Sequence, residues 1–277
     1  EGPMSTITVS RQLGTPGTEI AREVAERLNY EFVDKQRIGE ILTAGFGLGA
    51  ADLEKFDEKK PPFWEFLSVQ KTKYLLSIRA AIYDIAQKGR VVILGRGGQV
   101  LLRTLPGILH VRIFAPFSFR VKHLMEIAGG DEKEAARKLQ QSDHDSAAYI
   151  HSFFNADWED ASLYDLVLNA ETLSPPTAVQ LIMACAQSRE IQDGVERGKE
   201  RLADLALAQK AEAKLIATLG YAPRPLEIRV ERGVVFLQGT VSTPGLKKEC
   251  ERLIAAVEGV KQVRNELSVA QYYPYST

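Results

Sequence analysis

The first 190 residues alternate short runs of β-branched and apolar residues with longer segments of helical periodicity. The runs that predict strands are Thr6–Ser10, Phe32–Asp34, Val91–Gly95, His110–Ala115 and Leu163–Asn169. After the first run, Ile20, Val24 and Leu28 recur every fourth residue, which places them on one face of a helix. Strands that alternate with helices build parallel sheets, because a parallel crossover needs a helix-length connection. The pattern predicts an α/β fold with a doubly wound parallel sheet.

The pattern changes near Glu190 to a charged stretch that predicts a helical linker. Three strand-like segments follow at 226–232, 233–241 and 263–269, with an amphipathic helix at Pro244–Val257 between the last two. A chain of 277 residues exceeds one typical domain of ~100–200 residues. We therefore predict a first domain at 4–190, a helical linker at 191–209 and a small α+β domain of order αββαβ at 210–270.

Composition excludes several classes of protein. Lys and Arg (35) nearly balance Asp and Glu (36), so no overall field favours nucleic acid, and no nucleic-acid partner is expected. Apolar runs such as Val91 to Leu94 are far shorter than the ~20 residues of a membrane span. The first residues, EGPMSTITV, lack the pattern of an export signal, which favours a cytoplasmic location. Cys185 and Cys250 show no paired spacing and are expected to be buried, reduced thiols.

The segment Ile7–Ala21 has the strand, loop and helix order of a phosphate-binding loop, which aims backbone N–H groups at one point. Against the pattern G-x-x-x-x-G-K-[ST], the fixed positions hold Arg11, Pro16, Gly17 and Thr18, so only the hydroxyl position is filled. Arg11 could replace the missing lysine as the cation. The alternative interpretation is an ordinary turn in which Thr18 caps the helix.

A second loop, at Gly95, Arg96 and Gly97, follows a strand of the same sheet. Ligands of open α/β sheets bind at the carboxyl ends of the strands, and the Arg96 guanidinium matches a phosphate or carboxylate. The alternative is a structural salt bridge to a helix.

Three further groups of residues have simpler interpretations. The basic cluster Arg120, Lys122, His123, Arg137 and Lys138 is typical of a solvated helix face. The histidines around Asp143–Asp145 match no two-histidine metal motif. The stretch between Gln36 and Gly89 could form a movable substrate flap. The aromatic groups Phe63, Trp64, Phe66 and Tyr149, Phe153, Phe154, Trp158 are expected to pack the segments of this flap and not to stack on bases, because basic residues are not interleaved with them.

Residues 7–189 resemble the cytidylate kinase-like family, a divergent branch of the P-loop nucleoside monophosphate kinases. The resemblance rests on ITVSRQLGTPGTEIAREVAERL, YEFVDKQRI, VVILGRGGQVLL, IFAPFSFRVKHLME and DWEDASLYDLVLNAETL. It implies ATP with Mg²⁺ at the first loop and a nucleoside monophosphate, similar to CMP or dCMP, across a flap. The family already has a loop of the type S-R-x-x-G-x-x-G without the usual lysine.

The resemblance also implies roles for individual residues. The nucleotide-binding residues would be Arg11, Gly14, Gly17, Thr18, Asp34, Arg37, Gly95, Arg96 and Gly97. Arg120 and Lys122 would be the catalytic cations of the lid, and the Thr18 hydroxyl would lie near Mg²⁺. Charge is lacking at Thr18, His123 and Ser146, where the family usually has basic residues. One arginine can change phosphoryl transfer about 10³–10⁵-fold, so these differences bear on activity.

Residues 210–270 resemble a BON domain through GVVFLQGTVSTPGLKKECERLIAAVEGVKQVRNEL. This resemblance implies a small ligand or a phospholipid as partner, and a sensory or assembly role. Two functions follow for the whole chain. One is a nucleotide kinase regulated or localised by its BON domain. The other is a catalytically silent nucleotide sensor that signals through the BON domain. A kinase for another phosphate acceptor and a scaffold without nucleotide remain as further alternatives.

Overall fold

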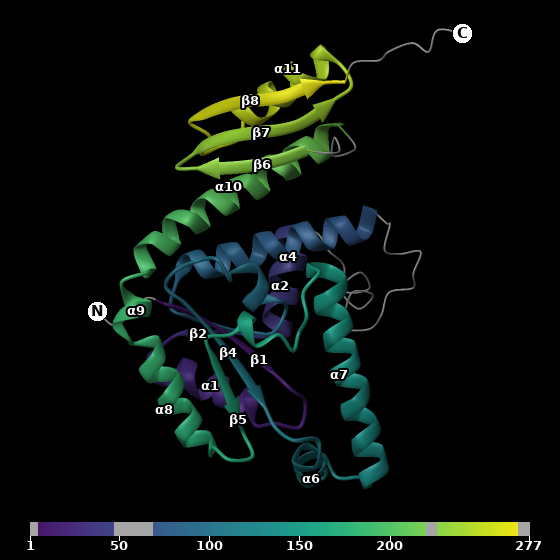
Figure 1. Cartoon of the computed structure of the whole chain (residues 1–277), viewed down its shortest axis with the longest axis vertical. Helices are drawn as coiled ribbons and strands as arrows, with labels where there is room; N and C mark the ends of the chain where they lie inside the picture. The colour runs from purple at the N-terminus through teal and green to yellow at the C-terminus, as the bar shows by residue number, and fades with distance from the viewer. Residues whose placement is uncertain (1–4, 47–68, 220–225, 271–277) are drawn as a thin grey trace. The chain divides into compact units, whose positions relative to one another are not determined.

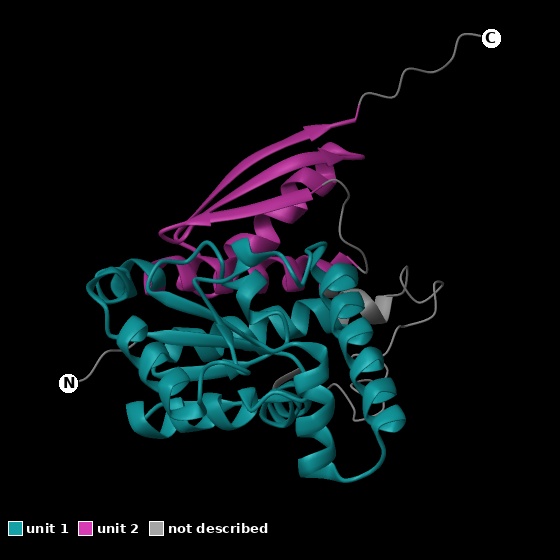
Figure 2. Cartoon of the chain, turned by 60° about the horizontal axis from the view of Figure 1, so that its bottom comes forward, with its two compact units in different colours: residues 1–198 teal, residues 199–277 magenta. Residues whose placement is uncertain are grey.

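The computed structural model describes residues 5–46, 69–219 and 226–270 (Figure 1). The chain divides into two compact units, residues 1–198 and 199–277, and each is described by itself (Figure 2). No helix in the described ranges is long and apolar enough to cross a membrane.

The first unit is built on a five-stranded sheet of order β2-β3-β1-β4-β5 in which all neighbours are parallel. The strands are β1 (Thr6–Arg11), β2 (Glu31–Val33), β3 (Val91–Leu94), β4 (Ile108–Phe114) and β5 (Leu166–Asn169). The helices are α1 (Gly17–Leu28), α2 (Lys35–Phe46), α4 (Val69–Lys88), α5 (Gly98–Leu101), α6 (Phe117–Ala128), α7 (Glu132–Phe154), the short 3₁₀ helix η2 (Ala161–Leu163), α8 (Pro175–Ala186) and α9 (Arg189–Gln192). The predicted doubly wound parallel sheet is confirmed.

The register of the sheet brings three loops to one edge. Val9 of β1 pairs with Leu94 of β3 and with Val111 of β4. Because all three strands run in the same direction, the loops that follow them, 12–16, 95–97 and 115–116, are neighbours at the carboxyl edge. This edge is where open α/β sheets bind ligands.

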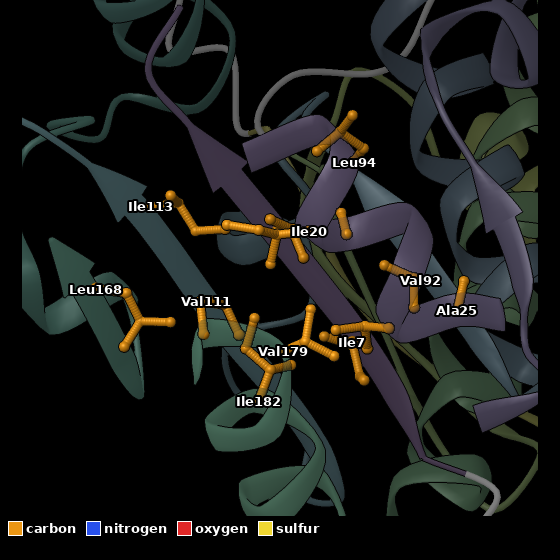
Figure 3. Close-up of a cluster of buried hydrophobic side chains, with 14 of the residues drawn as sticks. Ile7, Ile20, Ala25, Val92, Leu94, Val111, Ile113, Leu168, Val179 and Ile182 are labelled. Atoms are coloured by element: carbon orange, nitrogen blue, oxygen red, sulfur yellow. The ribbon is translucent and has the colours of Figure 1, made fainter. Parts of the chain in front are cut away.

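One face of the sheet is an apolar core under α1 and α8 (Figure 3). Ile7 and Val9 of the central strand pack with Ile20 and Val24 of α1. The predicted helical face at Ile20 and Val24 is therefore confirmed. Val179, on α8, completes the layer.

The other face of the sheet holds buried polar side chains. Thr8 Oγ1 lies 2.7 Å from His110 Nδ1, and Trp158 Nε1 donates to Ser10 Oγ at 2.9 Å. Arg112, also buried, donates to the carbonyl of Trp158 and stacks on its indole ring. Faces of parallel sheets are usually apolar, so this network is a departure from the usual pattern.

We predict that His110 makes the first unit less stable in acid. Burial lowers the pKa of His110, while Asp165 partly opposes the shift. Neutral His110 contributes its full share to the stability of the folded state above pH ~6.5, the ordinary pKa of histidine. This contribution is lost as pH falls from there through the lower pKa of His110 in the folded state. Within that window the free energy of unfolding falls by up to about 1.4 kcal/mol per pH unit. Urea unfolding followed by tryptophan fluorescence reports this unit alone, because both tryptophans lie in residues 1–198.

The expected result is a steeper loss of stability in acid for the wild type than for His110→Gln. His144→Gln, at an exposed position of α7, is the matched control and should keep the wild-type slope. Equal slopes in all three proteins would contradict the assignment to His110.

Several helix predictions can be compared with the structure. The sequence predicts a helical stretch at 120–154 with a break at Gly129 and Gly130, and the break is found there, between α6 and α7. It also predicts a closing helix at 175–189, but that helix, α8, ends at Ala186 and α9 follows. Cys185 is only half-buried, so the prediction that both cysteines are buried is correct for Cys250 alone. Phe63, Trp64 and Phe66 lie outside the described residues.

In the sequence, Gly194 and Gly198 predict a weak start for the helix of the charged stretch, because glycine is a poor helix former. In the structure they lie at the start of helix α10 (Val195–Leu219), where two backbone segments cross closely. A Cβ at Gly198 would lie 2.2 Å from the carbonyl oxygen of Pro106, and one at Gly194 would lie 2.4 Å from the nitrogen of Gly107. Gly107 itself has φ +78° and meets the backbone of Val195. Only glycines let the two segments approach this closely.

We predict that Gly198→Ala destabilises the first unit by about 1–3 kcal/mol, the usual cost of overpacking. The control is Gly245→Ala in helix α11 (Pro244–Ala255), where an added Cβ would lie 3.8 Å from Thr243 Oγ1, an ordinary van der Waals contact. Alanine favours helices over glycine, so this control should be neutral or slightly stabilising. Calorimetry of both variants measures the difference, and equal melting temperatures would contradict the crossing as the cause.

The second unit is a three-stranded sheet of order β6-β7-β8 with helices α10 and α11. Its strands are β6 (Leu226–Glu231), β7 (Val234–Val241) and β8 (Gln262–Val269); β6 pairs antiparallel and β8 parallel to β7. Val235 and Leu237 pack with Leu215 of α10 and Leu253 of α11. The predicted order αββαβ is confirmed.

Candidate functional site

The loop between β1 and α1 is fixed at both ends by hydrogen bonds from neighbouring elements. The N–H of Gln12 donates to the carbonyl of Ile113, and Gln12 Oε1 accepts from the N–H of Ala115 at 3.2 Å. Thr15 Oγ1 closes the turn by donating to the Gln12 carbonyl at 2.7 Å. The loop is thereby attached to the carboxyl end of β4.

The same loop presents N–H groups that have no acceptor. Within the described residues, no hydrogen bond satisfies the N–H groups of Leu13, Gly14, Gly17, Thr18 and Glu19. The last three begin α1, where the helix dipole adds positive potential. This arrangement can bind an anion such as phosphate. The helix cap is Pro16, which has no N–H, so the interpretation of Thr18 as the cap is wrong.

Arg11 brings a positive charge to the loop. Its stem passes over Gly17, where an added Cβ would lie 2.6 Å from Arg11 Cβ, so a larger residue at 17 would displace it. Its guanidinium makes no hydrogen bond or ion pair with any described residue, and this leaves its charge available to an anion. Thr18 is partly exposed, and its hydroxyl also makes no hydrogen bond within the described part of the chain.

Two side chains of helix α6 bind backbone carbonyls of the first loop. Arg120 Nη1 donates to the carbonyl of Leu13 at 3.3 Å, and His123 Nδ1 contacts the carbonyl of Gly14 at 2.9 Å. A carbonyl oxygen can only accept, so Nδ1 of His123 carries the proton. Gly14 has φ +80°, and an added Cβ would lie 2.8 Å from the Arg120 carbonyl oxygen. The loop needs glycine at this position.

The predicted lid cations Arg120 and Lys122 do not converge. Residues two apart on a helix are about 200° apart around its axis, and Lys122 is exposed whereas Arg120 is buried. Arg120 is bound to Asp143 of α7 by two hydrogen bonds of 3.0 and 2.8 Å. The interpretation of the basic cluster as a solvated face is wrong for Arg120 and fits Lys138, which pairs with Glu134 on the surface.

The loop after β3 lies beside the first one, because the N–H of Gly95 donates to the carbonyl of Val9 at 2.9 Å. Gly95, Arg96 and Gly97 all have positive φ, an uncommon conformation for the arginine. The Arg96 guanidinium lies 5.7 Å from the ring centroid of Tyr149. Burial raises the pKa of the Tyr149 hydroxyl well above its ordinary value, and the Arg96 charge partly lowers it.

Two aromatic residues of α7 pack on α4, within the predicted flap stretch 36–89, as expected. Phe153 lies 5.3 Å, ring centroid to ring centroid, from Tyr74, and the Tyr149 and Tyr74 hydroxyls are 3.2 Å apart. Phe154 instead covers Gly97, outside that stretch. Trp158 differs, because it packs on Arg112 and donates to Ser10.

Asp34 and Arg37 lie at the carboxyl end of β2, on the far side of β3 from the first loop. Asp34 Oδ1 accepts from the N–H of Arg37 at 3.0 Å and so caps α2. The Arg37 guanidinium pairs on the surface with Glu40 and Glu31. Their contact with an acceptor nucleotide stays a prediction.

Sequence reasoning missed the side chains that support the site. The sequence around Asp143 suggests only a metal ligand, whereas the Asp143 carboxylate binds Arg120; within the described residues no group of His, Cys, Asp and Glu could hold a metal. No motif in the sequence points to Ser10 or Arg112. One feature of the sequence does indicate the polar network: Thr6–Ser10 alternates polar and apolar residues, whereas a strand buried on both faces is usually apolar throughout.

The parallel sheet and its loop at the end of β1 define a nucleotide kinase-like protein. The cytidylate kinase-like family matches residues 6–172, and the BON domain matches residues 203–271. The chain belongs to the cytidylate kinase-like family and carries a BON domain.

Curated relatives and a solved structure agree with this assignment. A cytidylate kinase of Pyrobaculum islandicum is 26% identical over 178 residues, covering 64% of this chain and 90% of the relative. One of Methanocaldococcus jannaschii is 24% identical, covering 59% and 86%. An uncharacterised protein of Eubacterium ventriosum shares the fold with a TM-score of 0.53 and 23% identity, covering 67% of this chain and 99% of the other.

Proposed function

We propose that the chain binds ATP at residues 11–18 and transfers its terminal phosphoryl group to a nucleoside monophosphate similar to CMP or dCMP. The main support is the loop itself, whose N–H groups have no acceptor and whose Arg11 guanidinium has no partner among the residues that the structure describes. The names of the curated relatives, both cytidylate kinases, support the acceptor class. An oxygen of the acceptor phosphate attacks the γ-phosphorus, the bond to the β-phosphate oxygen breaks, and ADP leaves.

The residues present fit Mg²⁺ bound together with the nucleotide. Mg²⁺ usually keeps several waters and takes few protein ligands besides phosphate oxygens, so the Thr18 hydroxyl would suffice. The ion would neutralise charge that develops on the phosphates. Arg96, beside the first loop, would bind the acceptor phosphate.

The second candidate is a catalytically silent nucleotide sensor. The paired state of Arg120 and the outward position of Lys122 favour it, because phosphoryl transfer depends on cations around the transferred group. We propose that the BON domain, joined through a linker at 191–209, binds a small ligand or phospholipid and regulates or localises the chain. A cytoplasmic location stays a prediction.

One experiment separates the two candidates. Purified chain is titrated with ATP and with a panel of nucleoside monophosphates, and both the heat of binding and ADP release are followed. Turnover of ~1–100 s⁻¹, the range of kinases, supports the enzyme. Binding without turnover supports the sensor, and no binding refutes both.

We predict that Arg11→Gln weakens ATP binding about tenfold or more, since a hydrogen bond to a charged group contributes about 1.5–3 kcal/mol. Arg27→Gln, near the other end of α1, is the matched control; Arg27 pairs with Glu23 on the surface and should leave ATP affinity unchanged. Isothermal titration measures both. Equal affinities of the two variants would place the phosphates elsewhere.

We further predict that Arg96→Gln weakens nucleoside monophosphate binding about tenfold or more while ATP affinity is kept. The control is Arg103→Gln, at an exposed arginine bonded to Ser162. A large drop in melting temperature with unchanged monophosphate affinity would show that Arg96 supports the packing of Tyr149 instead.

A further inference from the structure

The buried ion pair of Arg120 and Asp143 joins the phosphate loop to α7. The Arg120 side chain is 5% exposed and that of Asp143 is 28% exposed. Both carboxylate oxygens accept from the guanidinium, at 3.0 Å from Nη1 and 2.8 Å from Nη2. Its other hydrogen bonds go to backbone carbonyls, from Nε to Ala115 at 3.2 Å and from Nη1 to Leu13, and the guanidinium lies 5.4 Å from the ring centroid of Phe117.

These contacts occupy the N–H groups of the Arg120 guanidinium that a phosphate would bind. Arginine binds phosphate through two parallel N–H groups, the same geometry with which it binds a carboxylate. Asp143 covers the edge formed by Nη1 and Nη2, and Ala115 takes Nε on the other edge. The Leu13 contact places this guanidinium against the carbonyl side of the loop. A phosphate that reaches this guanidinium from the loop must share Arg120 with Asp143 or displace it.

We propose that Asp143 is an internal competitor of the nucleotide phosphates for Arg120 and so sets the affinity of the loop for di- and triphosphates. The inference rests on the proposed ATP site at residues 11–18. When a phosphate binds the Arg120 guanidinium, it replaces the Asp143 carboxylate, which is also an anion. The net gain in binding free energy is therefore small. Without the carboxylate, the same guanidinium would bind phosphate with its full charge.

Removal of the carboxylate has two effects that can be measured separately. In the free protein it leaves a buried cation without a counter-charge, which is strongly destabilising. In the nucleotide complex the phosphate supplies that counter-charge. The loss of stability should therefore be smaller with ATP bound, and the rise in melting temperature on ATP addition should be larger than in the wild type.

The test compares Asp143→Asn with Asp145→Asn by isothermal titration and thermal unfolding with ATP. Asp145 is a matched control, because it lies two residues further along α7 and accepts from Gln141 instead of an arginine. Both variants remove one negative charge from the same helix. We expect Asp143→Asn to bind ATP about tenfold more tightly and to show the larger ATP-induced shift, whereas Asp145→Asn stays near the wild type.

A second measurement uses the wild type, in case Asp143→Asn does not fold. Hydrogen exchange of the amides of α7 around residue 143 should become faster when ATP binds, because the pair to Arg120 breaks. Slower or unchanged exchange would overturn the proposal. ATP affinity of Asp143→Asn that is unchanged or weaker would do the same and would leave Asp143 as a structural partner. A wild type that binds no ATP refutes the proposed function and this inference with it.

Discussion

The carbonyl groups of Leu13 and Gly14 face helix α6, where Arg120 and His123 bind them. Each peptide unit is planar, with its N–H opposite its carbonyl, so the contact with the Leu13 carbonyl also directs the N–H of Gly14 away from Arg120. The N–H that follows the Gly14 carbonyl, that of Thr15, donates to the Gln12 carbonyl. Two side chains one helical turn apart thus set the conformation of the candidate anion-binding loop. Because Arg120 also binds Asp143, the position of α7 and the geometry of the loop are coupled.

The two faces of the sheet contribute differently to this site. The apolar face under α1 and α8 supplies the burial that stabilises the unit. The polar face ties β1 and β4 to the segment that contains Trp158, through Ser10 and Arg112. Ser10 immediately precedes Arg11, so this network also fixes the strand end from which the loop cation emerges. A purely apolar face would bury as much area without orienting that end.

The fold was largely predictable because it depends on periodicity, which the sequence shows directly. The strands, the break at Gly129 and Gly130 and the order of the second unit followed from local patterns. The site was less predictable, because it depends on partners far apart in sequence. Arg120 and Asp143 are 23 residues apart, and nothing in their spacing indicates that they meet. Gly194 and Gly198 indicated a weak helix start, whereas the cause is Pro106 and Gly107, on a distant segment.

The number of cations around the first loop bears on whether the chain can catalyse phosphoryl transfer. Near the first loop, Arg11 has no partner within 5–46, 69–219 and 226–270, Arg120 is compensated by Asp143, and Lys122 points away from Arg120. Ser146 lies one turn after Asp143 on α7, so a cation there would share the side of the helix that faces Arg120. The chain has a hydroxyl at that position. Release of Arg120 from Asp143 would supply a further cation on this side of the loop. Under the proposed function, the strength of this pair therefore bears on catalysis as well as on binding.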